Sequence, residues 1–143
     1  MCGIFGRIGS GLTREQAEAA AATAARLLRH RGPDGQAALV EEGVLLGSTR
    51  LAIMDPANGS QPFITPSGQT VVFFNGEIYN WRALAADLAA HGRHLSSRCD
   101  GAVLPHLYEI YGDAFLPMVD GMFALAIWDR RRRRLLLAVD RMA

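Results

Sequence analysis

The sequence of 143 residues lacks the features that mark membrane-spanning, secreted or nucleic-acid-binding proteins. No apolar run approaches the roughly 20 residues needed to span a bilayer. The N-terminus has no charged segment followed by an apolar run, so no signal peptide is predicted. The formal net charge is only +1, which gives no overall field to attract nucleic acid or anionic lipid. These absences argue against a membrane or nucleic-acid partner.

Cysteine and histidine are also scarce. The two cysteines, Cys2 and Cys99, are too few for a disulfide scaffold, so a cytoplasmic location is expected. The four histidines are scattered without the spacing of metal ligands, so no metal site is predicted. Five consecutive arginines at 130–134 indicate a solvated turn. A nucleic-acid patch is the weaker alternative, because no aromatic residues interleave with them.

The composition itself is that of a globular protein, with 50% apolar and 20% charged residues. The length predicts one domain over residues 1–143. Hydrophobic patterning predicts strands at 2–8, 36–41, 43–48, 70–74, 121–129 and 134–139, and helices at 14–29, after Asn80 and at 102–111. Because strands and helices are grouped instead of alternating, the fold class is α+β with antiparallel sheets.

Local signals define the ends of these elements. Thr13, followed three residues later by Gln16, predicts a capping box for the first helix. Its apolar face is expected to contain Ala17, Ala20, Ala21, Ala24, Leu27 and Leu28. Asn80 is expected to cap the second helix, and Asn75-Gly76 to end the strand at 70–74. A further extended stretch is expected at 50–54, followed by a long irregular loop at 55–68.

Cys2 is the first candidate for catalysis. If Met1 is removed, one residue carries both a thiol and a free α-amine, whose unperturbed pKa is about 7.7–8.0. An N-terminal residue of this kind can supply its own nucleophile and its own base. The alternative is that a cysteine at position 2 has no function, since a lone cysteine is weak support for one.

Six segments in order favour the catalytic interpretation. They are Cys2–Gly6, Arg29–Asp34, Thr49–Ile53, Gln61-Pro62, Phe74–Asn80 and Asp120–Ala124. On these segments the chain resembles the glutaminase domain of class II glutamine amidotransferases, which are N-terminal nucleophile hydrolases, within the glutamine-hydrolysing asparagine synthetase family. The resemblance implies a four-layer αββα sandwich of two antiparallel sheets.

The resemblance also implies a mechanism. Cys2 would attack the side-chain amide of glutamine, and a γ-glutamyl thioester would form. Amide hydrolysis passes through an oxyanion that needs preorganised donors, and the resemblance assigns this role to the Asn75 side chain and the Gly76 N–H. A plain turn is the alternative for Asn75-Gly76, because Asn-Gly is a common turn dipeptide.

The substrate-binding residues are likewise implied by the resemblance. Arg50 would bind the α-carboxylate of glutamine, for which a guanidinium fork is suited; a structural ion pair is the alternative. Asp100 would bind the α-ammonium group, with Glu77 nearby. The pocket would be lined by Leu51, Ile53 and Met54. Arg31 would brace the site or serve the fold alone.

The ammonia is expected to serve a synthetase-type protein partner, with a homo-oligomer as the other expected assembly. The glutaminase domain itself is expected to need no cofactor, and ATP and Mg²⁺ are expected only in an absent synthetase domain or in a partner. The family's glutaminase domain continues beyond residue 141, so the chain is expected to be incomplete at its C-terminal end. Other possibilities are a non-catalytic interaction module and a hydrolase of another amide.

The chain departs from the family pattern at several positions. Gly101 and Ala102 follow Asp100, where the family usually has a small hydroxyl or thiol residue and then Glu. Ser48 stands where a His is frequent, and Val139 where an Arg is usual. The first departure leaves the ammonium site with Asp100 but without the Glu.

Overall fold

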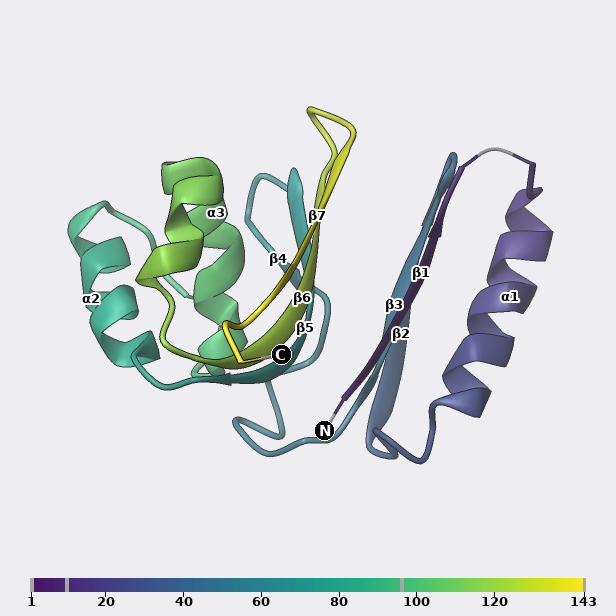
Figure 1. Cartoon of the computed structure of the whole chain (residues 1–143), viewed down its shortest axis with the longest axis horizontal. Helices are drawn as coiled ribbons and strands as arrows, with labels where there is room; N and C mark the ends of the chain where they lie inside the picture. Colours follow the sequence, from purple (N-terminus) through teal and green to yellow (C-terminus); the bar gives the residue numbers. More distant parts are fainter. Residues whose placement is uncertain (1, 10, 96, 143) are drawn as a thin grey trace.

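A computed structural model describes residues 2–9, 11–95 and 97–142. Its elements form four layers (Figure 1). One helix covers the outer face of a three-stranded sheet, this sheet faces a four-stranded sheet, and the remaining helices cover the far side. The arrangement confirms the α+β class that the sequence pattern predicted and the αββα sandwich that the family resemblance implied.

The three-stranded sheet has the order β1-β3-β2 and is antiparallel throughout. Its strands are β1 (Gly3–Ile8), β2 (Gly35–Glu41) and β3 (Val44–Arg50). The two strands predicted at 36–41 and 43–48 are confirmed, and they pair as an antiparallel hairpin. β3 continues to Arg50, and no strand forms over residues 51–54, so the stretch predicted at 50–54 belongs to the sheet only at Arg50.

Helix α1 (Arg14–Leu27) covers the outer face of this sheet, and the predicted capping box between Thr13 and Gln16 is present. The buried residues are Ala17, Ala21 and Ala25, spaced four apart as expected for one helix face. Two residues expected on this face, Ala20 and Leu27, are exposed. The contact face is therefore narrower than the hydrophobic pattern indicated.

The four-stranded sheet has the order β4-β5-β6-β7 and is also antiparallel. It contains β4 (Phe63–Ile64), β5 (Thr70–Ile78), β6 (Gly121–Asp129) and β7 (Arg134–Val139). The short strand β4 lies inside the segment that was expected to be wholly irregular. Three of the arginines in the β6–β7 turn region pair with carboxylates, as expected for a solvated turn: Arg130 with Glu41, Arg132 with Asp129 and Arg134 with Asp113.

The sequence prediction that β5 ends at Asn75-Gly76 was wrong. β5 runs on to Ile78, and Asn75 and Gly76 pair with Ala124 and Phe123 of β6. Gly76 has a φ of 150°, and a Cβ there would lie 2.1 Å from the carbonyl oxygen of Met122. The glycine therefore allows close contact within the ladder instead of forming a turn.

The far side of the four-stranded sheet is covered by α2 (Trp81–Ala90), the short 3₁₀ helix η1 (Asp100–Val103), α3 (Leu104–Tyr111) and the 3₁₀ helix η2 (Gly112–Met118). Asn80 occupies the N-cap position of α2, as predicted, but its side chain makes no capping hydrogen bond to the helix. Its side chain donates to Met118 O at 2.9 Å and accepts from Asp120 N–H at 3.0 Å, which ties the start of α2 to the segment before β6.

Two apolar cores hold the layers together. Between the sheets lie Val44, Leu46, Val71, Phe73, Ala126 and Trp128. A larger core between the four-stranded sheet and the helices includes Phe74, Leu88, Leu104, Leu107 and Phe115. Strand β5 contributes alternate residues to both cores, because successive side chains of a strand point to opposite faces. None of the helices in the described part of the chain has the length and apolar character needed to cross a membrane.

Candidate active site

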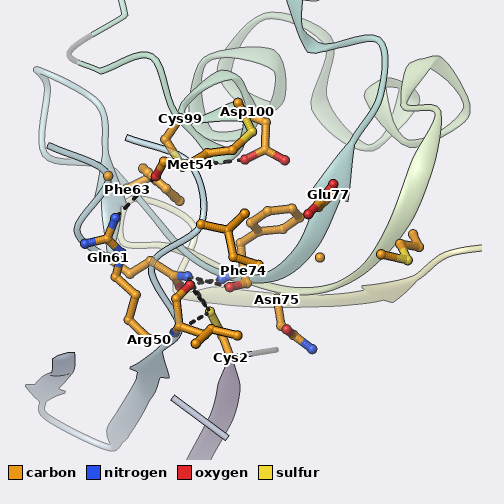
Figure 2. A pocket seen from close by; sticks show the side chains of 15 residues that line it. Cys2, Arg50, Met54, Gln61, Phe63, Phe74, Asn75, Glu77, Cys99 and Asp100 are labelled. Carbon is orange, nitrogen blue, oxygen red and sulfur yellow. Dashed lines mark hydrogen bonds between the residues drawn. The ribbon is translucent and has the colours of Figure 1, made fainter. Parts of the chain in front are cut away.

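One pocket brings together the start of β1, the end of β3, the segment after it, the end of β5 and the start of η1. Every predicted site residue except Arg31 lines it. These are Cys2, Arg50, Leu51, Ile53, Met54, Asn75, Gly76, Glu77 and Asp100. Figure 2 shows Cys2 and Asp100 at opposite ends of this pocket.

The sulfur of Cys2 is held mainly by the peptide groups of Leu51. The N–H of Leu51 donates to Sγ at 3.4 Å, and the carbonyl oxygen of Leu51 lies 3.9 Å from Sγ. The Gln61 side-chain amide nitrogen is 4.0 Å from the same sulfur. Within the described residues, no hydrogen bond joins Cys2 to a histidine or a carboxylate. Met1 lies outside the described residues, so its removal stays a prediction.

The loop after α1 positions the end of β3 next to Cys2. Arg31 Nε donates to the carbonyl oxygen of Cys2 at 3.5 Å, although Arg31 does not line the pocket. A Cβ at Gly32 would lie 2.4 Å from the backbone of Thr49, so only glycine allows this approach. Asp34 accepts the N–H of Ala52 at 2.8 Å. The loop therefore fixes the backbone on both sides of Leu51.

The side chain of Gln61, two residues before β4, hydrogen-bonds to the edge of β5. Its side-chain amide accepts from Phe74 N–H at 2.8 Å and donates to Phe74 O at 2.5 Å. The amide thus pairs with β5 as a neighbouring strand would. Asn75, the next residue, is half-buried, and its side chain makes no hydrogen bond to another described residue. It remains available to a ligand in the pocket.

The guanidinium of Arg50 is held by three carbonyl oxygens of the following loop. Nη1 donates to Pro56 O at 3.0 Å, and Nη2 donates to Asp55 O at 3.0 Å and to Met54 O at 3.4 Å. No carboxylate of the described residues lies within 4.0 Å of it, so the alternative of a structural ion pair does not hold. A guanidinium has five N–H groups, and its positive charge is not neutralised by these contacts.

Asp100 is a buried carboxylate, only 3% exposed. Its Oδ2 accepts Ile78 N–H at 2.7 Å, and its Oδ1 accepts from the thiol of Cys99 at 3.5 Å. Burial, followed by the charge of Asp100, raises the pKa of Cys99 to about 12. Cys99 therefore stays a neutral thiol and a hydrogen-bond donor at neutral pH. A carboxylate with spare acceptor capacity at a pocket wall suits a cationic ligand group.

The residues after Asp100 also have a structural explanation. A Cβ at Gly101 would lie 2.5 Å from the ring of Phe63 and 2.9 Å from that of Phe74, so both rings occupy the space of a side chain. Ala102 is 3% exposed and belongs to the larger apolar core. These positions contribute packing, not polar groups, beside Asp100.

Sequence reasoning missed several residues of the pocket wall. They are Gly59, Gln61, Phe63, Phe74, Cys99 and Met122. Gln61, Phe74 and Met122 lie in segments that carried the family resemblance, so they could have been nominated from it. Phe63 and Cys99 gave no signal, because only the fold brings them to the pocket. Across the described ranges, no three His, Cys, Asp or Glu side chains are grouped so as to hold a metal ion.

Comparisons with known proteins agree with this geometry. The sequence model of a family described as "Glutamine amidotransferase domain" matches residues 1–143. The chain is 39% identical over 140 residues to glutamine-hydrolyzing asparagine synthetase 2 of Oryza sativa subsp. japonica. It is 38% identical over 143 residues to glutamine-hydrolyzing asparagine synthetase 2 of Bacillus subtilis (strain 168). The matches cover 98% and 99% of this chain, but only 23% and 19% of those proteins.

A solved structure shows the same fold at lower sequence identity. Glutamine phosphoribosylpyrophosphate amidotransferase from B. subtilis, complexed with ADP and GMP, superimposes with a TM-score of 0.73 at 20% identity. The match covers 96% of this chain and 37% of that one. The chain thus spans about a quarter or less of the curated relatives and just over a third of this structure.

Proposed function

Since the chain belongs to the class II glutamine amidotransferase domain family, we propose that it hydrolyses glutamine to glutamate and ammonia with Cys2 as nucleophile. One observation carries the proposal. A thiol, a guanidinium, a buried carboxylate and a side-chain amide without a partner among the described residues line one pocket: those of Cys2, Arg50, Asp100 and Asn75. Glutamine presents the complementary groups, namely an amide carbonyl, an α-carboxylate and an α-ammonium.

The chemistry begins with a proton transfer from the Cys2 thiol to its own α-amine, directly or through a water molecule, once Met1 is removed. No histidine or carboxylate among the described residues contacts the thiol, which leaves the amine as the base. The sulfur then attacks the amide carbon of glutamine. Its electron pair forms the C–S bond, and the carbonyl oxygen takes the negative charge.

The oxyanion is stabilised by the Asn75 side chain and the Gly76 N–H. The β-ladder supports this assignment. Phe123 exchanges hydrogen bonds with Asp140 on the side of β7, and Phe123 is the partner of Gly76. In an antiparallel ladder, such a pair is not hydrogen-bonded across β5 and β6. The pattern therefore predicts that the Gly76 N–H points to the free edge of β5, where Gln61 meets Phe74.

The intermediate collapses when the proton held by the α-amine passes to the departing nitrogen. The C–N bond breaks, ammonia leaves, and a γ-glutamyl thioester remains on Cys2. Water, with its proton taken by the same amine, attacks the thioester through a second oxyanion at the same donors. The C–S bond then breaks, glutamate leaves, and the thiol is restored.

Recognition of the substrate is assigned to the two charged ends of the pocket. Arg50 binds the α-carboxylate through the N–H groups that its three carbonyl contacts do not use. Asp100 binds the α-ammonium group, with Glu77 beside it. The walls formed by Leu51, Ile53 and Met54 enclose the apolar methylenes. Arg31 acts by bracing the carbonyl group of Cys2.

The ammonia serves an asparagine-synthetase-like amidotransferase reaction. The similarity to asparagine synthetases over the whole chain supports this assignment. The matched region spans about a quarter or less of those proteins. We assign the acceptor site to a synthetase-type domain or partner. ATP and Mg²⁺ belong to that component.

The test combines intact mass with turnover. The mature protein should lack Met1, release ammonia from glutamine, and become modified at Cys2 by a glutamine-shaped electrophile such as 6-diazo-5-oxo-L-norleucine. Cys2→Ala should abolish ammonia release and modification, while Cys99→Ala should retain both. Ammonia release that survives in Cys2→Ala, or modification at Cys99 instead, would refute the assignment.

A further inference from the structure

The loop that holds Arg50 contains an unusual backbone conformation at Asp55. Its φ is 42°, in the left-handed region, and Arg133 is the only other non-glycine residue of the described chain with a positive φ. Such conformations are uncommon outside glycine, and Asp and Asn are the residues that tolerate them best. They persist where the surroundings hold them, which is frequent beside functional sites.

This conformation turns consecutive carbonyl groups toward Arg50. The carbonyl oxygens of Met54, Asp55 and Pro56 all accept from its guanidinium, at 3.0–3.4 Å. Asp55 O also accepts Gly59 N–H at 2.8 Å, which closes the loop. A Cβ at Gly59 would lie 2.9 Å from Arg50 Nη2, so the loop packs tightly around the guanidinium.

The carboxylate of Asp55 makes no ion pair with Arg50 and instead joins its own loop to a segment that is distant in sequence. Oδ1 accepts the N–H and the side-chain amide of Asn58, at 3.3 and 3.0 Å. Oδ2 accepts the N–H of Arg98 at 3.0 Å. The Arg98 N–H is the main reason that the pKa of Asp55 is lowered, so the carboxylate is ionised at neutral pH. Arg98 stands two residues before Asp100 in the chain.

Asp55 therefore contacts both segments that carry the charged ends of the pocket, but it does not line the pocket itself. We propose that Asp55 is a positioning residue that fixes the spacing between Arg50 and Asp100, and thereby sets the enzyme's preference for a substrate with both an α-carboxylate and an α-ammonium. The inference rests on the proposed glutaminase function and adds a specificity determinant to it.

The physical argument concerns the link between the two segments. Without the Asp55 carboxylate, the described residues offer no other hydrogen bond between the 54–59 loop and Arg98. The Arg50 and Asp100 sides could then shift separately, and each would bind its end of glutamine less well. The Cys2 sulfur is held by Leu51, on a different set of contacts, and should keep its reactivity.

The experiment compares three variants of Asp55 with a neighbouring control. Asp55→Gly removes the carboxylate but accepts the positive φ, Asp55→Ala removes the carboxylate and strains the backbone, and Asp55→Asn keeps one acceptor oxygen. Asn58→Ala is the matched control, because it removes one contact of Oδ1 and leaves the Arg98 link intact. The readouts are kcat and KM for glutamine, and the rate of Cys2 alkylation by iodoacetamide, which lacks an amino-acid backbone.

We expect Asp55→Gly to raise KM for glutamine roughly 10- to 100-fold, as for loss of a hydrogen bond to a charged group, with little change in kcat or in alkylation by iodoacetamide. Asp55→Asn should have a smaller effect in the same direction, and it serves if the other variants fail to fold. Asn58→Ala should change KM by no more than about threefold.

An unchanged KM in Asp55→Gly, or in Asp55→Asn if only that variant folds, would overturn the inference while leaving the proposed function intact. Equal losses in glutamine turnover and iodoacetamide alkylation would also overturn it, because the loop would then support the nucleophile and not substrate recognition. A wild-type protein with no turnover of glutamine would overturn both the inference and the proposed function.

Discussion

Replacing Asn75 should separate catalysis from folding in this protein. The Asn75 side chain is half-buried in the pocket wall and makes no hydrogen bond to the described residues. Its removal therefore breaks no internal contact of this kind, and the free energy of unfolding should change by no more than about 0.5 kcal/mol. If its amide stabilises the oxyanion, Asn75→Ala should lower kcat by about 10²–10³, which corresponds to roughly 2.7–4 kcal/mol.

Asn80 provides the matched control, because its side-chain amide, unlike that of Asn75, makes hydrogen bonds within the protein. Its two hydrogen bonds, to Met118 O and from Asp120 N–H, join α2 to the segment before β6. Asn80→Ala leaves both partners without this contact and should cost about 1–3 kcal/mol of stability. Because Asn80 does not line the pocket, kcat of the folded fraction should remain within a few-fold of wild type.

The assay pairs urea unfolding with ammonia release at saturating glutamine. Asn75→Asp refines it, because this variant keeps the shape of the side chain, loses the N–H donors and adds a negative charge beside the developing oxyanion. It should be at least as slow as Asn75→Ala. A kcat for Asn75→Ala within threefold of wild type, in a protein of unchanged stability, would refute the assignment of Asn75 to the oxyanion.

Two further predictions follow from buried titratable groups. With a pKa of about 12, Cys99 is about 0.01% thiolate at pH 8. Peptide mapping should therefore show that iodoacetamide alkylates Cys99 roughly 10³-fold more slowly than a free thiol of pKa about 8.5, with a rate that rises about tenfold per pH unit. Alkylation of Cys99 as fast as that of the free thiol would contradict its burial. Burial, followed by the charge of Arg93, lowers the pKa of His106 below 6.5. The Nδ1 atom of its ring has no hydrogen-bond partner among the described residues. The folded state therefore binds a proton at His106 more weakly than the unfolded chain does. The contribution of neutral His106 to stability is fully present above pH 6.5 and is lost as the pH falls through its folded pKa. The urea midpoint of unfolding should therefore fall less on acidification in His106→Leu than in the wild type. An equal fall of the midpoint in both proteins would contradict the prediction.

The strands of the two sheets were largely predictable from the sequence, because their patterns are local. The β2–β3 hairpin and the α1 capping box follow from short segments whose turn and capping residues agree with their hydrophobic pattern. The errors fell where tertiary pairing overrides a local signal. Asn75-Gly76 has the sequence of a turn, but its pairing with β6 keeps it in a strand.

The pocket was predictable to the extent that its residues fall within the segments that carry the family resemblance. Cys2, Arg50, Asn75 and Asp100 were all expected there, and all line one cavity. The contacts that hold Arg50 were not predictable, since they depend on three carbonyl groups of an irregular loop and not on side-chain identity.

The contacts of the Cys2 sulfur with the N–H and carbonyl groups of Leu51 have a consequence for how the site can change. Every amino acid except proline would offer the same two backbone groups at position 51, so most substitutions there would leave the contacts of the sulfur unchanged. A new side chain at this position would instead change the shape of the cavity wall. The substrate range of such a protein could thus diversify while its nucleophile stayed in place.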